Sequence, residues 1–196
     1  MRWLPLLLVL AACDSSSETV VLTAETAVLD ASGPELTLYA LAEGRVVPTD
    51  SAGTSLAWDL GVRGTEIVLN GGASGPGAGV GALVDSAFAA VEAVAIEGVT
   101  LRRDGESACA SGAARAVCAA PGDPTSPYTV TAGTVEADDA RTLVLRTGDG
   151  QGWAKVRVTD YTSDDPGAPE TAGTVTIEYL VNPVGRGLVA GEEVTL

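Results

Sequence analysis

Few side chains in this sequence could do chemistry, because histidine is absent and sulfur is scarce. The 196 residues hold no histidine, a single methionine at Met1, and three cysteines, Cys13, Cys109 and Cys118. Without histidine there is no Ser-His-Asp or Cys-His catalysis and no histidine metal site. Lysine occurs once, at Lys155, which removes most lysine chemistry. The composition leaves a binding or structural module, or an enzyme built on carboxylates.

The carboxylates are not arranged for catalysis. Asp138-Asp139, Asp164-Asp165 and Glu192-Glu193 are adjacent pairs. Neighbouring residues on a strand point to opposite faces, so such pairs make poor acid–base couples. The acidic segment 160–170 offers a loose calcium loop as an alternative, although it lacks the spacing of an EF-hand. The sequence therefore predicts a binding protein that is not an enzyme.

The charge balance excludes one class of partner. Acidic side chains number 26 against 11 basic ones, giving a formal net charge of -15. Nucleic-acid binding requires clustered lysine and arginine, which this chain lacks. Hydrophobic residues make up 46% of the chain, enough for a core, and the length fits one domain.

The N-terminus predicts export and a lipid anchor. After Met1-Arg2 comes an apolar run over 3–12, which is too short to span a bilayer but suits a signal peptide. The run ends in small residues before Cys13, which resembles the lipobox of bacterial lipoproteins. We expect a signal peptide over 1–12, lipidation of Cys13, a polar tether over 13–18 and one domain over 19–196. The expected location is the bacterial cell envelope, on the periplasmic face or the cell surface; a plain secreted protein is the alternative.

The two remaining cysteines form an even pair in an oxidising compartment. Cys109 and Cys118 flank a segment rich in Ala, Ser and Gly, which a disulfide would hold together. A redox pair or a thiolate metal site is the alternative, although no Cys-x-x-Cys motif is present. We expect a structural disulfide.

Short β-branched runs separated by Gly, Pro and Asn predict an all-β, antiparallel, sandwich-like domain with one short helix. The helix is expected over 86–96. The segments 142–146 and 153–158 are expected to form a hairpin, and 188–189 to pair with 194–196. The other expected strands are 19–23, 36–41, 58–62, 65–69 and 174–179.

Individual residues on these strands have mainly structural interpretations. Trp58 and Trp153 are expected to anchor the core, and Asp59 to face solvent or cap a turn. Lys155 is placed on one strand face with Trp153, Arg157 and Tyr161, either a solvated face or a surface facing a ligand. The glycine-rich loop 71–81 either bends sharply or lets a partner approach closely.

Three segments carry a family resemblance. They are Trp58 through Asn70-Gly71-Gly72 to Val80, Leu145 through Asp149-Gly150 to Tyr161, and 173–179. Their order resembles that of the HmuY family of haem-binding bacterial lipoproteins, over roughly residues 36–182. The resemblance implies a lipid-anchored β-protein whose loops capture haem or a porphyrin.

The family ligates haem iron through histidine or methionine, and the mature chain contains neither. Tyrosine is a further known haem ligand. Tyr128, in a loop segment outside the expected strand core, and Tyr161 are therefore the candidate cofactor-binding residues. Two hypotheses follow: a ligand-binding lipoprotein for haem or another apolar small ligand, or a structural or protein-interaction lipoprotein that does not bind haem.

Overall fold

The computed structural model describes residues 19–94, 98–106 and 109–196. The expected signal peptide, Cys13 and the tether lie outside the described residues. Within these ranges no helix is long and apolar enough to cross a membrane.

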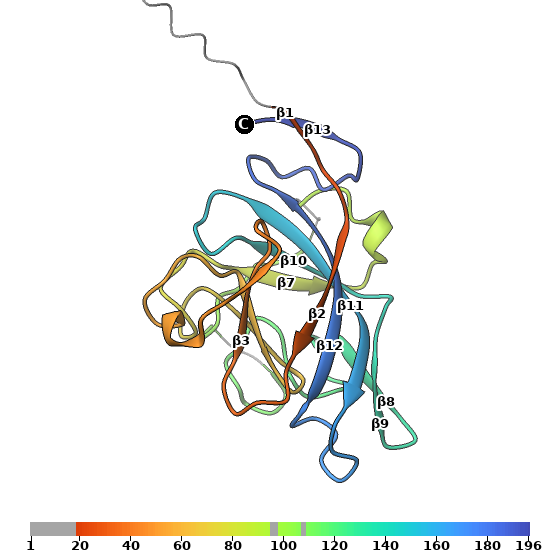
Figure 1. The fold of residues 1–196 in the computed structure, drawn as a ribbon. Helices are drawn as coiled ribbons and strands as arrows, with labels where there is room; N and C mark the ends of the chain where they lie inside the picture. The colour runs from red at the N-terminus through yellow and green to blue at the C-terminus, as the bar shows by residue number, and fades with distance from the viewer. Residues whose placement is uncertain (1–18, 95–97, 107–108) are drawn as a thin grey trace, which may run out of the picture.

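Two antiparallel sheets form the body of the molecule (Figure 1). The larger sheet contains, in spatial order, β2 (Glu25–Asp30), β12 (Gly173–Asn182), β11 (Trp153–Ser163), β10 (Thr142–Arg146) and β7 (Gly81–Val84). The smaller sheet contains β4 (Arg45–Val47), β3 (Thr37–Ala40), β5 (Leu60–Arg63) and β6 (Glu66–Leu69). The predicted hairpin is confirmed, because Arg146 at the end of β10 pairs with Trp153 at the start of β11.

Two strand pairs lie at opposite ends of this body. At one end, β1 (Thr19–Val21) pairs with β13 (Glu193–Thr195), so the first and last described strands lie side by side (Figure 1). The expected pairing of 188–189 with 194–196 is therefore wrong, because β1 takes the place of 188–189. At the other end, β8 (Tyr128–Thr131) and β9 (Thr134–Ala137) form a hairpin.

The main core lies between the two sheets, which makes the domain a sandwich and confirms the all-β prediction. Alternate residues of β12 point into it: Val175, Ile177 and Tyr179 are each at most 2% exposed. From the smaller sheet, Leu60 and Ile67 meet them. This alternation is the period-2 pattern of a strand with one buried face.

The outer faces of both sheets are also covered in part. Val144 and Leu180 on the larger sheet lie under Phe88, Val91 and other apolar side chains. On the smaller sheet, Trp58 is completely buried against residues of β3 and β6, as expected of a core anchor. Trp153 is only half-buried, and the guanidinium of Arg186 lies 5.2 Å from its ring.

The expected helix over 86–96 is wrong in its described part. Only a 3-10 helix is present there, over Phe88–Ala90, and the chain becomes extended at Val91. Phe88 and Val91 both pack onto the sheet, and the ammonium group of Lys155 takes the carbonyl oxygens of both residues. In an α-helix the carbonyl of Phe88 would be occupied by an amide four residues later.

A β-bulge divides β11 into two parts. Val158 pairs with Ile177 and Asp160 with Thr176, so Thr159 is an extra residue without a partner. Because one added residue reverses the side of every later side chain, Tyr161 points into the core, opposite to Lys155. The expected face shared by Lys155 and Tyr161 is therefore wrong.

Candidate functional site

A cleft opens beside the C-terminal end of β12. Its first cavity has a volume of about 300 Å³ and is walled by Leu56, Val181 and Pro183, with Glu43, Asp59 and Asp149 among its lining side chains. A second cavity of about 220 Å³ shares Ala42, Val181 and Pro183 with the first and reaches Val21 of β1. We refer to these two cavities together as the cleft.

The cleft is apolar and acidic. Glu25 lines its second cavity, and the described lining of both cavities contains no lysine or arginine. The cleft therefore attracts apolar groups and repels anionic ones.

Asp59 is the buried carboxylate of the cleft. It is 6% exposed, and its Oδ2 and Oδ1 accept hydrogen bonds from the main-chain nitrogens of Leu41 and Gly148, each at 2.7 Å. The pKa of Asp59 is raised to about 6, chiefly by burial. The hydrogen bonds from Gly148 and Leu41 oppose the shift, and the nearby carboxylates of Asp149 and Glu43 add to it. Of the two alternatives expected for Asp59, capping a turn is therefore correct and facing solvent is wrong.

The glycine-rich loop is built around Asn70. The Nδ2 of this buried amide donates to the carbonyl oxygens of Ser55 and Trp58, and its Oδ1 accepts from the nitrogen of Gly77 at 3.0 Å. A Cβ atom on Gly75 would overlap Asn70. The glycines therefore allow the Asn70 side chain of the same chain, and not a partner, to lie close to the loop backbone.

Both candidate tyrosines belong to the core. Tyr128 is completely buried, contrary to the expected loop position, and its ring packs edge-on against Tyr161 at 5.4 Å. Its hydroxyl has no hydrogen-bond partner, and burial raises its pKa. The hydroxyl of Tyr161 lies 2.8 Å from the carbonyl oxygen of Pro169, beside a separate cavity of about 360 Å³, and burial raises its pKa as well.

The other two tyrosines form a chain of hydrogen bonds that runs from the core to the exposed Glu25. The hydroxyl oxygens of Tyr39 and Tyr179 are 3.2 Å apart, and Tyr179 donates to Oε2 of Glu25 at 2.8 Å. Burial and these two partners raise the pKa of Tyr179. Tyr179 also lines the second cavity of the cleft, with its hydroxyl already bonded.

Lys155 does not lie on a solvated face. It is 3% exposed, and its Nζ donates to the carbonyl oxygens of Phe88 and Val91, each at 2.9 Å. The same nitrogen lies 4.5 Å from the centre of the Phe88 ring. Burial lowers the pKa of Lys155. Its contacts fasten the 86–94 segment onto the sheet.

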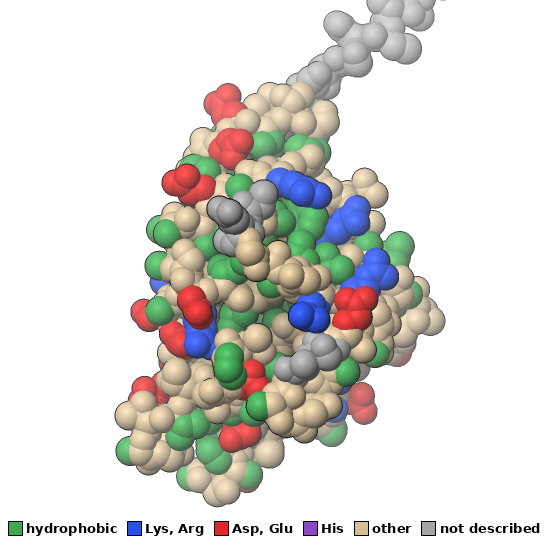
Figure 2. Space-filling model, turned by 180° about the vertical axis from the view of Figure 1, so that it is seen from behind, with side chains coloured by type: hydrophobic (Ala, Val, Ile, Leu, Met, Phe, Trp, Pro, Cys, Tyr) green, Lys and Arg blue, Asp and Glu red, His purple; other side chains and the backbone are tan. Residues whose placement is uncertain are grey.

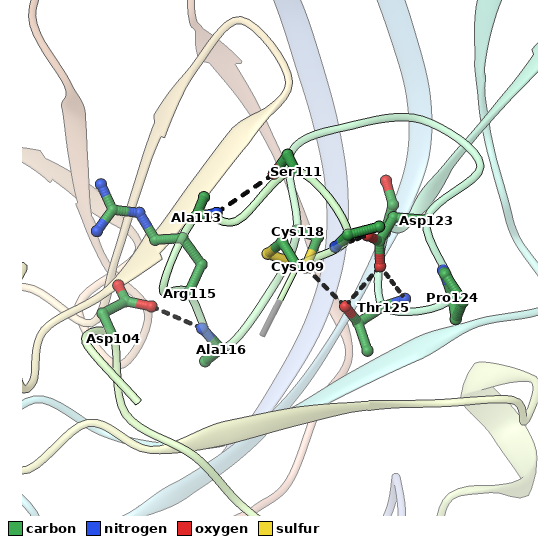
Figure 3. The surroundings of a disulfide bond; sticks show 12 residues. Asp104, Cys109, Ser111, Ala113, Arg115, Ala116, Cys118, Asp123, Pro124 and Thr125 are labelled. Atoms are coloured by element: carbon green, nitrogen blue, oxygen red, sulfur yellow. Dashed lines mark hydrogen bonds between the residues drawn. A yellow bond between two sulfur atoms is a disulfide. The ribbon is translucent and has the colours of Figure 1, made fainter. Parts of the chain in front are cut away.

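The predicted disulfide between Cys109 and Cys118 is confirmed (Figure 3). Beside it, the carboxylate of Asp123 accepts from the nitrogens of Ala110 and Thr125. Asp104, which is also buried, accepts from the nitrogens of Leu69 and Ala116 and so attaches the disulfide loop to the smaller sheet. These polar groups serve the structure of the loop.

The acidic segment 160–170, the alternative calcium loop, does not gather its carboxylates. Asp165 accepts from the nitrogen of Gly167, and Asp160 accepts from the hydroxyl of Thr162. Across the described part of the chain, no three Asp, Glu, Cys or His side chains come together in a group that could hold a metal ion.

Basic side chains gather on another face. Figure 2 shows several of them around an apolar strip, with acidic side chains mostly towards the margins of this view. One arginine, Arg102, lines a cavity of about 330 Å³ with Leu83 and Thr125. This cavity would suit an anionic group better than the cleft does.

The donor atoms of the described residues do not fit a haem iron. Each described tyrosine hydroxyl is either hydrogen-bonded or sealed in the core, the lysine is bonded to two carbonyl oxygens, and Cys109 and Cys118 are bonded to each other. The cleft contributes carboxylates, which are not among the usual axial ligands of haem.

Comparison with known proteins identifies the scaffold. A family model described as HmuY protein matches residues 32–179. The fold is similar to the crystal structure of an apo HmuY analog of Tannerella forsythia, with a TM-score of 0.53 and 16% sequence identity. That match covers 87% of this chain and all of the other. At this identity the likeness concerns the fold alone. No curated protein matches the sequence.

Proposed function

This chain belongs to the HmuY family, and from that premise we propose that it is an exported, lipid-anchored binding protein and not an enzyme. The ligand site is the cleft. The observation that carries the proposal is the pair of cavities, about 300 and 220 Å³, with shared apolar walls. Together they fall within the usual range of about 300–1,000 Å³ for small-molecule sites.

The lipid anchor is supported by the sequence around Cys13 and by the position of β1. This strand lies at one end of the domain (Figure 1), so a tether that precedes it would leave the domain at that end. Labelling cells with a radioactive fatty acid tests the anchor. The wild-type chain should be labelled and the Cys13→Ala variant should not; label on the variant would contradict the proposal.

The ligand class that the family implies is a tetrapyrrole, haem or an iron-free porphyrin. Apolar contact with Leu56, Val181 and Pro183 would supply the affinity. Glu43 and Asp149 would repel the propionates of a porphyrin. Because salt screens such repulsion, binding should strengthen as the ionic strength rises.

Tryptophan fluorescence of the full chain in detergent, titrated with protoporphyrin IX, tests the cleft. Trp58 is adjacent to Asp59 of the cleft and should be quenched by a bound porphyrin. Ala42 lines both cavities, so Ala42→Glu should weaken binding about tenfold or more. The control Ala190→Glu adds the same charge at an exposed position that lines neither cavity. Equal losses in both variants, or no saturable quenching of the wild type, would contradict the proposal.

The second candidate function, a protein-interaction lipoprotein, is favoured by one observation. Both β2 and β4 are edge strands, and they expose Val28 at 67% and Val46 at 57%. Exposed apolar edge strands can pair with another chain. If the full chain binds no porphyrin, the protein-interaction function becomes the favoured one.

A further inference from the structure

The donor atoms that proteins offer to haem iron belong to histidine, methionine, cysteine thiolate and tyrosine. Histidine is eliminated by composition. The single methionine, Met1, lies in the signal peptide that, on the proposed function, is removed from the mature chain. What the remaining types can do depends on their surroundings in the fold.

The described cysteines offer no thiolate. Cys109 and Cys118 are bonded to each other and are 6% and 1% exposed. Cys13, on the proposed function, carries its lipid on sulfur. On the proposed function, the mature chain therefore keeps no thiolate that could bond iron.

The tyrosines are engaged or inaccessible. Tyr128 is sealed in the core, the hydroxyl of Tyr161 faces the carbonyl oxygen of Pro169, and that of Tyr179 faces Glu25. Tyrosine bonds iron as the phenolate. Burial raises the pKa of all three groups, so the phenolate is less accessible here than in water.

Tyr39 is 5% exposed, and its hydroxyl contacts that of Tyr179. If the Tyr39 side chain turned towards a ligand, the hydrogen bond between the Tyr39 and Tyr179 hydroxyl groups would be lost inside the protein. The Lys155 amine is likewise held by two carbonyl oxygens beneath the 86–94 segment. Neither group can reach an iron atom without unpacking a core.

We infer that no side chain of this protein bonds the iron of a bound haem, so that its binding site does not distinguish haem from the iron-free porphyrin. The inference rests on the proposed function, and it departs from the iron ligation that membership of a haem-binding family implies. Affinity then comes from the porphyrin face and its substituents.

Parallel titrations of the full chain in detergent, with ferric haem and with protoporphyrin IX, test this inference. The two dissociation constants should agree within about threefold. The Soret band of bound ferric haem should also be the same in wild type, Tyr161→Phe and Tyr179→Phe. Haem binding about tenfold or more tighter than protoporphyrin binding, with the difference lost in either variant, would overturn the inference.

The same titrations separate this inference from the proposed function. If neither pigment binds, and ferric haem keeps the spectrum it has in detergent alone, the tetrapyrrole function fails while the absence of iron ligation is upheld. If both bind equally, both statements hold. Binding of haem alone contradicts the inference and supports a haem function.

Discussion

Oδ1 of Asp59 accepts a hydrogen bond from the main-chain nitrogen of Gly148, 2.7 Å away and 89 positions later in the chain. Asp59 precedes β5 of the smaller sheet, whereas Gly148 lies in the turn between β10 and β11 of the larger one. The second oxygen binds the nitrogen of Leu41. One carboxylate thus joins the two sheets at the wall of the cleft.

Asp59 should make stability depend on pH. Its folded pKa of about 6 lies above the unfolded value of about 3.9. A raised pKa means that the folded state binds the proton more tightly. The stabilisation is therefore complete below about pH 4 and is lost as the pH rises through 6. Relative to Asp59→Asn, the wild-type free energy of unfolding should fall by about 2–3 kcal/mol between about pH 4 and pH 7.5.

Urea denaturation of both proteins across this pH range measures the difference. Asp50→Asn, at an exposed position, is the matched control and should track the wild type. A wild-type minus Asp59→Asn difference that does not change with pH would contradict the raised pKa.

The glycine at position 148 should not tolerate a side chain. A Cβ there would overlap the carbonyl oxygen of Trp58, whereas a Cβ on Gly53 meets nothing within 4 Å. Gly148→Ala should lower the free energy of unfolding by about 1–3 kcal/mol, and Gly53→Ala by less than about 0.5 kcal/mol. Chemical denaturation measures both. Equal effects would show that the turn relaxes to admit the methyl group.

The two candidate tyrosines should respond differently to loss of the hydroxyl. Tyr161→Phe removes a hydrogen bond to Pro169 and should lower stability by about 0.5–1.5 kcal/mol. Tyr128→Phe removes a buried hydroxyl without a partner, so stability should be unchanged or higher. Thermal denaturation of the pair decides this. A clear loss in Tyr128→Phe would reveal a hydrogen bond to that hydroxyl.

The disulfide should stabilise the domain without shaping the cleft. Replacing both Cys109 and Cys118 by Ala should lower the free energy of unfolding by about 2–3 kcal/mol. The loss is no larger because a short closed loop restricts the unfolded chain less than a long one does. Reductant should destabilise the wild type by a similar amount and leave the double variant unchanged. A reductant effect on the double variant would place the sensitivity elsewhere.

Strands with a complete pattern could be predicted from the sequence. The segment 174–179 alternates apolar and polar residues and is buried accordingly, and 142–146 is β10 from end to end. In contrast, β8 and β9 are not among the predicted strands, although the run Tyr128–Thr131 is aromatic and β-branched and is followed by Gly133, the signal of a short hairpin. The surrounding region is rich in Gly, Pro and Asp and is typical of a loop. The described segment 86–94 contacts Lys155, a residue distant in sequence, through the carbonyl oxygens of Phe88 and Val91, and a local pattern does not reveal such contacts.

The cleft could not be predicted, because its walls come from segments far apart in the chain. Glu43, Asp59 and Asp149 are ordinary acidic residues until the fold places them around one cavity. A partial signal was present: Glu43 and Asp149 follow predicted strands, in turns where polar residues are common. The reversal of Tyr161 depended on the bulge at Thr159, and a strict period of two cannot anticipate an added residue.

Hydrogen exchange of the full chain, with and without saturating protoporphyrin IX, tests whether the cleft is the ligand site. We expect slower exchange confined to the segments that line the cleft, which are 20–25, 41–43, 56–59, 147–152 and 181–183. Protection confined instead to 81–83 and 98–102, around the cavity with Arg102, would contradict this expectation, as would no protection anywhere.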